Sequence, residues 1–343
     1  MNSELCKFKL KNLISLLLVS FILATCVACN KESNTDDTFS VENPFSSDFI
    51  NNENVMFAYG FGTVSPSAEE TIKYNGSPIE IEYYIDNAGA TMNSGMSIFL
   101  NGIPQEYQVE GSKEKTYMHI TEVKEKTIKR IKISFIPVIG VKGEILNIRF
   151  ISILNPQIRP NKLEYLFAHT NSMTTFLPRK LQMMENSPND NNSNYNLLPA
   201  QREMTKEELN KVIYIDSKGN QINKFRTFNM FITDAKDHKQ SYINNDNGHL
   251  NILMQSYGGP EEKYLIIPYI NHIEFSSNTF PSILSIESGH KIFEENFQIS
   301  INNIDRNKYK IKEYNTFYIL AIPLSDNNET DPIISESLVF KGE

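Results

Sequence analysis

Short stretches of alternating apolar and polar residues, separated by turn signals, recur along the chain and restrict it to a mainly β fold. Ile79–Asp86 mostly alternates apolar and polar residues, as a strand with one buried face should. Asn101-Gly102 follows another apolar stretch, and this dipeptide favours the positive φ angles of a two-residue hairpin. The spacing predicts an antiparallel β-sandwich, with a closed barrel as the alternative. Its strands are predicted at Val55–Tyr59, Ile79–Asp86, Met96–Leu100, Ile103–Val109, Thr116–Thr121, Thr127–Pro137 and Ile145–Leu154.

A second β-rich region begins near residue 211 and continues to residue 343. Asn247-Gly248 is its hairpin signal. We therefore predict two tandem antiparallel β-sandwich domains, at 53–155 and 211–343. The strands expected in the second are Thr227–Thr233, His249–Gln255, Tyr264–Ile270, Phe297–Ile301, Thr316–Leu324 and Ser337–Phe340.

Residues 156–210 lack this pattern and are interpreted as a partly helical linker. Leu163–Phe176 is predicted to form a short helix, and the Asn- and Pro-rich stretch 184–199 a disordered loop. Thr205 and Glu208 have the spacing of a capping box, in which each side chain binds the other residue's backbone N–H. A second short helix is therefore predicted to start there.

The N-terminal segment has the pattern of an export signal. Three lysines precede the apolar run Leu13–Val27, which is shorter than the roughly 20 residues needed to span a bilayer. Cys26 and Cys29 lie at its end, and a polar stretch follows at once. We interpret 1–28 as a signal peptide and 29–52 as a flexible tether.

This segment resembles a Gram-positive bacterial lipoprotein signal. The resemblance implies a diacylglycerol anchor on Cys29, with Cys26 as the alternative, and a location on the extracellular face of the cytoplasmic membrane. An ordinary cleaved secretory signal is the competing interpretation. In pattern alone, 79–154 is similar to immunoglobulin-like or fibronectin-like bacterial surface modules. Similarity of that kind does not transmit function, so no functional residues are carried over.

Composition removes several classes of function. The formal net charge of −8 disfavours nucleic acid as a partner, because its recognition depends on Lys and Arg neutralising phosphates. All three cysteines, Cys6, Cys26 and Cys29, lie in or beside the signal. The predicted sandwiches must therefore be stabilised by core burial, without disulfides, thiol chemistry or cysteine metal ligands.

The folded region lacks recognisable catalytic motifs. It contains neither glycine-rich phosphate loop, no Gly-x-Ser-x-Gly elbow and no His-Glu-x-x-His. The richest polar stretch offers carboxylates and imidazoles for a metal or an acid–base pair, but we interpret it as a solvated loop. It comprises Asp234, Asp237, His238, Asp246 and His249. A later loop has oxygen ligands for calcium but lacks the EF-hand spacing, so a polar turn is preferred. Those ligands would be Asp326, Glu329 and Asp331.

Three hypotheses of function follow. The leading one is a non-enzymatic lipoprotein that binds a peptide, glycan or protein partner and needs no cofactor beyond its lipid. The second is a surface hydrolase with its site around Asp234, Asp237 and His249, where paired carboxylates can cleave a glycosidic bond. The third is an immunity lipoprotein that captures a cationic antimicrobial peptide, which the acidic charge would steer inward.

Overall fold

The computed structural model describes residues 58–67, 70–163, 173–175, 179–189, 195–215, 221–223, 227–238, 242–325 and 330–342. The predicted signal peptide and tether, with Cys26 and Cys29, lie outside these ranges, and their assignment stays a prediction. Among the described residues, no helix has the length and apolarity needed to cross a membrane.

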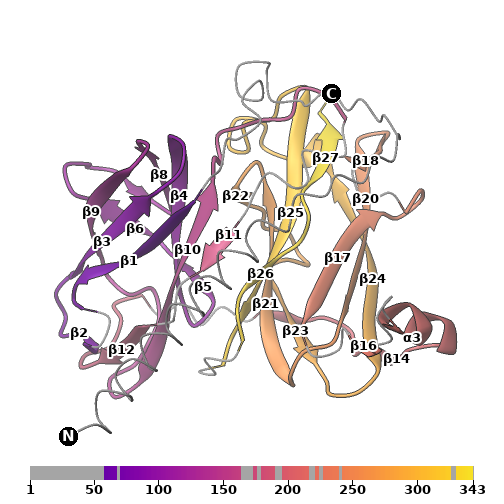
Figure 1. Cartoon of the computed structure of the whole chain (residues 1–343), viewed down its shortest axis with the longest axis horizontal. Coiled ribbons are helices and arrows are strands. Elements are labelled where there is room, and N and C mark those ends of the chain that lie inside the picture. The colour runs from indigo at the N-terminus through magenta and orange to yellow at the C-terminus, as the bar shows by residue number, and fades with distance from the viewer. Residues whose placement is uncertain are drawn as a thin grey trace, which may run out of the picture. The chain divides into compact units, whose positions relative to one another are not determined.

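The first sandwich packs a five-stranded sheet against a seven-stranded one (Figure 1). The smaller sheet has the order β1 (Tyr59–Ser65), β3 (Ile79–Asn87), β9 (Thr127–Phe135), β6 (Tyr107–Val109) and β7 (Lys115–Thr116). The larger has the order β2 (Ile72–Tyr74), β12 (Arg179–Met183), β10 (Ile145–Leu154), β4 (Met92–Leu100) and β5 (Ile103–Gln105), with β8 (Met118–Val123) beside β4 and β11 (Met173–Thr175) beside β10. Alternate residues of β3 point into the shared core, as its sequence predicts: Ile79, Ile81, Tyr83 and Ile85.

The second sandwich, drawn in orange and yellow in Figure 1, packs an eight-stranded sheet against a five-stranded one. The larger sheet has the order β13 (Asn196–Leu197), β23 (Ser282–Ile286), β21 (Glu262–Ile270), β25 (Tyr314–Pro323), β27 (Leu338–Lys341) and β18 (Tyr242–Ile243), with β22 (Ile273–Glu274) beside β21 and β26 (Ile333–Ile334) beside β25. The smaller has the order β14 (Arg202–Glu203), β24 (Lys291–Ser300), β20 (His249–Tyr257) and β17 (Asn229–Asp234), with β19 (Asn245–Asp246) beside β20. Four short elements complete the described fold: the antiparallel pair β15 (Ile213–Ile215) and β16 (Gln221–Asn223), the helix α3 (Lys206–Val212) and the 3-10 helix η3 (Ile301–Asn303).

The mainly β fold and the sandwich architecture are thus as predicted, and three local signals are confirmed with them. Asn101-Gly102 joins β4 to β5 and Asn247-Gly248 joins β19 to β20, all four residues having positive φ. Thr205 and Glu208 form the capping box of α3, with the Thr205 N–H donating to the Glu208 carboxylate at 2.7 Å. Arg202 reinforces it through two hydrogen bonds to the same carboxylate.

The segment predicted as a linker also supplies strands to both sandwiches. β11 and β12 pair with β10, while β13 and β14 pair with β23 and β24. The helix predicted over 163–176 is therefore wrong at Met173–Thr175, which form β11; residues 164–172 lie outside the described ranges. Backbone pairing with the neighbouring strand outweighs a weak helical pattern here.

Four central strands are buried on both faces, because the larger sheets of the two sandwiches pack against each other. Along β21, Ile266 faces the core of its own sandwich, whereas Ile267 packs into a separate apolar layer. β4 and β10 contribute to that layer from the first sandwich, and β21 and β25 from the second. We call this layer the seam; its buried members are Phe99, Ile151, Ile153, Leu265, Ile267, Tyr269, Tyr318, Leu320 and Ile322.

Candidate functional site

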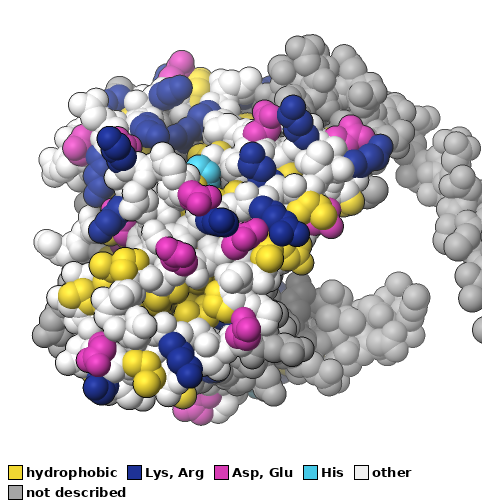
Figure 2. All heavy atoms as spheres, turned by 90° about the vertical axis from the view of Figure 1, so that its left-hand side faces the viewer, with side chains coloured by type: hydrophobic (Ala, Val, Ile, Leu, Met, Phe, Trp, Pro, Cys, Tyr) yellow, Lys and Arg dark blue, Asp and Glu magenta, His cyan; other side chains and the backbone are white. Residues whose placement is uncertain are grey.

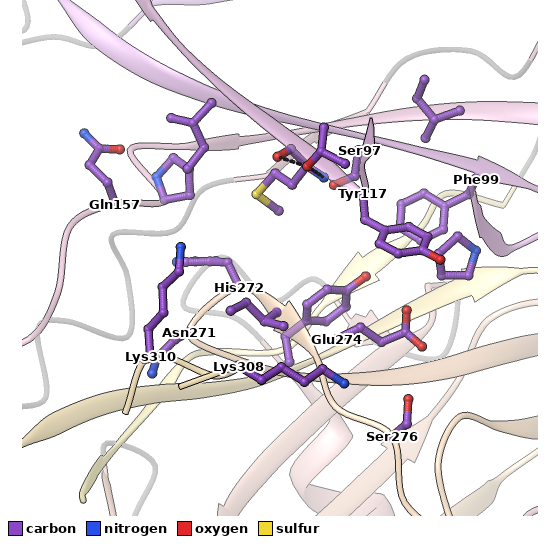
Figure 3. Close-up of a pocket in the computed structure, with 18 of the residues that line it drawn as sticks. Ser97, Phe99, Tyr117, Gln157, Asn271, His272, Glu274, Ser276, Lys308 and Lys310 are labelled. Atoms are coloured by element: carbon purple, nitrogen blue, oxygen red, sulfur yellow. Dashed lines mark hydrogen bonds between the residues drawn. The ribbon is translucent and has the colours of Figure 1, made fainter. Parts of the chain in front are cut away.

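A pocket of about 580 Å³ opens where the seam ends, with walls from both sandwiches (Figure 3). Phe99 and Tyr269 belong both to the seam and to the pocket wall. The pocket therefore adjoins the apolar seam, and its remaining lining includes polar residues. Tyr117 and Ile120 of the first sandwich lie at the rim, 53% and 44% exposed. The opposite wall carries Asn271, His272, Glu274, Lys308 and Lys310.

A tight turn places His272 in this wall. Asn271 and His272 have φ angles of 52° and 64°, and their flanking residues Ile270 and Ile273 pair as the ends of β21 and β22. This is the geometry of a two-residue hairpin, formed here without glycine. Asn271 is stabilised in it because its side-chain amide donates to the Tyr309 carbonyl at 2.9 Å and its carbonyl accepts from the Thr316 N–H at 3.0 Å.

His272 is buried and neutral. Burial, with the positive charge of Arg159 nearby, lowers its pKa to about 3. Its Nδ1 lies 3.1 Å from the hydroxyl of Tyr318, whose ring is stacked on Tyr269 at a centroid separation of 5.1 Å. Burial raises the pKa of Tyr318, so this hydroxyl keeps its proton.

Two buried nitrogen atoms in the pocket wall have no hydrogen-bond partner among the described residues. They are Nε2 of His272 and Nη1 of Arg159, in the segment after β10. Leaving a buried polar group unpaired costs about 1–3 kcal/mol, and more for a charged one. Each such group needs an explanation, and a bound water, an ion or a ligand in the pocket would supply one.

Glu274 brings a single carboxylate to the other end of the pocket. Burial raises its pKa, and this effect is opposed by the positive charge of Lys308 and by a hydrogen bond from Ser276. Figure 3 places the Glu274 side chain between Ser276 and Tyr117, which comes from the opposite wall. The pKa of Tyr117 is in turn raised, first by burial and then by the charges of Glu106 and Glu274.

The pocket is electropositive in an acidic protein. Arg159, Lys308 and Lys310 line it against the one carboxylate of Glu274, while the chain as a whole has 41 acidic and 33 basic residues. The outer face of the first sandwich differs, because acidic and basic side chains are interspersed over it (Figure 2). Arg130 and Glu82 form one ion pair of β9 and β3, at 3.6 Å.

The polar cluster predicted between β17 and β20 is brought together, but its acidic groups are occupied by structural bonds. The buried carboxylate of Asp234 accepts backbone N–H groups from Lys236, Asp237 and Asn244 at 2.8–2.9 Å. The other two carboxylates of the cluster are also bonded. Asp237 Oδ2 accepts a hydrogen bond from Asn244 Nδ2 at 2.7 Å, and Asp246 Oδ2 pairs with Lys236 Nζ at 2.6 Å. The cluster closes a turn in this arrangement.

The two imidazoles of that cluster lie apart from its carboxylate bonds. His238 is exposed at a positive φ of 51°, with its backbone N–H bound to the Asp234 carbonyl. His249 begins β20 and is half-buried. Of the calcium candidates, Asp326 and Glu329 lie outside the described residues, and Asp331 is exposed. Within the described ranges, no group of three or more metal-ligating residues gathers.

Sequence reasoning missed most of the pocket. His272 and Glu274 stand two residues apart, which is the spacing of one strand face, but His272 belongs to the turn instead. The available signal was Asn271, since Asn tolerates positive φ better than most residues. Arg159, Lys308 and Lys310 carried no motif. Arg159 meets His272 only through the packing of the two sandwiches, and Lys308 and Lys310 come from another loop of the second sandwich.

No family model matches the chain, and no curated protein sequence matches it. Among solved structures, the CsuC–CsuE chaperone–tip adhesion subunit pre-assembly complex of Acinetobacter baumannii aligns at 11% identity and a TM-score of 0.20, covering 84% of this chain and 100% of that one. The E. coli chaperone DraB aligns at 8% identity and a TM-score of 0.22, covering 84% and 96%. A Porphyromonas gingivalis W83 protein of unknown function aligns at 7% identity and 0.23, covering 82% and 99%. Similarities at this level transfer neither site nor function.

Proposed function

We propose that this protein is a non-enzymatic binding protein, held on the extracellular face of the cytoplasmic membrane by a diacylated Cys29. Its ligand, or the terminal group of a peptide or glycan ligand, enters the pocket at the end of the seam. The observation that carries this proposal is the pair of buried, unpartnered nitrogen atoms, from His272 and Arg159, in one pocket.

The size and lining of the pocket support binding. Ligand pockets in proteins span roughly 300–1,000 Å³ and combine apolar walls with a few convergent polar groups. A volume of about 580 Å³ falls within that range, and Phe99, Tyr117 and Tyr269 supply aromatic walls. The side chains of Tyr117 and Ile120 at the rim are exposed enough to meet an incoming ligand.

The surroundings of His272 favour binding over general-base catalysis. A catalytic imidazole is commonly oriented by a carboxylate that stabilises its charged form. Here Nδ1 faces the protonated hydroxyl of Tyr318, and a pKa of about 3 leaves the ring a poor base. His272 is therefore suited to donate or accept one hydrogen bond to a ligand.

The test is ligand capture by the full-length protein in detergent micelles. Peptide and glycan libraries would be screened by ligand-observed NMR against wild type and against Ile120→Trp, which fills the pocket mouth from an exposed position. Ile128→Trp is the matched control, since Ile128 is 60% exposed and lies outside the pocket. We expect ligands that bind wild type and the control but not Ile120→Trp. Capture of nothing, or equal capture by all three proteins, would refute the proposal.

A further inference from the structure

We infer that the pocket binds a small organic anion, whose carboxylate or phosphate head is held by Arg159 and His272 while its body lies against the aromatic rim. This inference rests on the proposed binding function and adds the chemical class of the ligand. Three features support it: the two unpaired nitrogen atoms are donors, the residues around them are mostly basic, and the opposite wall is apolar.

The hydrogen bond at Nδ1 decides which ring nitrogen of His272 carries the hydrogen. The buried hydroxyl of Tyr318 has His272 Nδ1 as its one hydrogen-bond partner among the described residues. A buried hydroxyl hydrogen needs an acceptor, so Tyr318 donates to Nδ1. In a neutral imidazole with Nδ1 as acceptor, the hydrogen is on Nε2. The unpartnered Nε2 is therefore a donor, and its acceptor must come from a water or a ligand.

Arg159 supplies the second donor and a full positive charge. A guanidinium has only donors, so the unpartnered Nη1 also requires an acceptor. Burial lowers the pKa of Arg159, yet arginine stays charged in proteins. His272 is held in place by its turn and by the Tyr318 hydroxyl. Two donors, one of them cationic, suit the oxygens of a carboxylate or phosphate.

Charge near the donors points the same way. Lys308 and Lys310 line the same wall as His272. Glu274, the one carboxylate among the lining residues, has a raised pKa and is directed toward Ser276 and Tyr117 (Figure 3). An anionic head near Arg159 would thus meet a positive potential, while the net charge of −8 repels it from the rest of the surface. Selectivity for anions in an acidic protein requires such a local reversal.

The body of the ligand would lie against the other wall. Phe99, Tyr117 and Ile120 present apolar surface across from the donors, and the pocket volume suits a molecule with one ring. Phenylacetate and phenyl phosphate are suitable probes, because they join an aromatic ring to the two candidate heads. Phenylacetamide keeps the ring and loses the charge, which makes it the matched neutral probe.

The experiment measures binding of the three probes to full-length protein by ligand-observed NMR, with Ile120→Trp in the same micelles to subtract nonspecific partitioning. We expect at least one anion to bind, and about tenfold weaker binding or none for phenylacetamide, since a hydrogen-bonded charge contributes this much or more. Whichever anion binds more tightly identifies the head. Arg159→Gln should weaken anion binding by about tenfold or more.

One control variant and a second pocket variant keep the outcome interpretable. Arg130→Gln removes an exposed arginine from the outer face of β9 and should leave binding unchanged. His272→Asn retains a residue that tolerates positive φ and removes the Nε2 donor, so it should also weaken the anion. Each variant is first compared with wild type by circular dichroism.

Failure of this inference can be told apart from failure of the binding function. If phenylacetamide binds the pocket as tightly as the anions, or if Arg159→Gln and His272→Asn change nothing, the anion assignment is overturned while the binding function stands. If neither anion binds above the Ile120→Trp background, the assignment is overturned and the library screen alone decides the binding function.

Discussion

Ile266 and Ile267 are adjacent, fully buried and of the same type, and they test whether the seam is a packed core. Ile266 faces the interior of the second sandwich, and Ile267 faces the seam. Both are 0% exposed. If the seam is packed like a protein interior, replacing either by alanine should cost a similar free energy of unfolding.

The magnitude follows from the atoms removed. Ile→Ala deletes three carbons, which at about 0.8 kcal/mol per buried CH₂ gives about 2.4 kcal/mol of lost transfer energy. The cavity left behind adds to this, and measured Ile→Ala changes in cores fall at about 2–5 kcal/mol. We therefore expect about 3 kcal/mol for Ile266→Ala and for Ile267→Ala.

Guanidinium unfolding followed by circular dichroism measures both changes; the chain has no Trp to report by fluorescence. Leu197→Ala, at a residue 70% exposed, is the surface control and should stay within about 0.5 kcal/mol of wild type. A cost for Ile267→Ala as small as that of the control, beside a full cost for Ile266→Ala, would show that the seam is not packed in solution and would contradict the description of the pocket.

Three further predictions concern stability. Gly248→Ala and Gly143→Ala both place a side chain at positive φ, but only the first brings its Cβ within 2.0 Å of a neighbouring asparagine side chain, so Gly248→Ala should lower the melting temperature more. The bond from Arg202 lowers the pKa of Glu208 to about 2, so the ionised carboxylate stabilises the fold above the unfolded-state pKa of about 4.5 and this contribution is lost as pH falls toward 2. Glu208→Gln should lower the free energy of unfolding by about 1 kcal/mol at neutral pH. It should also make the urea midpoint less dependent on pH between these two values, which urea titrations at several pH values would measure. Arg202→Met should do the same, while leaving anion binding at the distant pocket unchanged.

What the sequence predicts well in this chain is local. The period of two in β3, the Asn-Gly hairpins and the capping box each depend on residues within a few positions of one another, where steric and hydrogen-bonding preferences act directly. β3 also has one face in a core and one near the surface, so its alternation is visible in the sequence itself. These signals sufficed for the mainly β sandwich fold.

What the sequence does not predict depends on pairing over distance. β11 to β14 are two to five residues long, and each is defined by its partner strand rather than by its own pattern. In β21 the run of apolar residues around Ile266 indicates burial on both faces, but the pattern cannot say that the second face meets another sandwich. Without that contact, Arg159 and His272 have no reason to be considered together.

Ligand binding in the pocket and packing of the seam are consequently coupled energetically. The seam ends where apolar residues give way to the Asn271-His272 turn on one side and to Tyr117 and Ile120 on the other. A ligand that bridges these walls adds contacts present only when the two sandwiches are together, and it must stabilise their packing by an amount that grows with RT ln(1 + [L]/Kd). Linkage is reciprocal, so a mutation that weakens the packing of the seam must also weaken ligand binding. Ile267→Ala should therefore reduce anion binding although it touches no ligand, whereas Ile266→Ala, which faces away from the seam, should reduce it less.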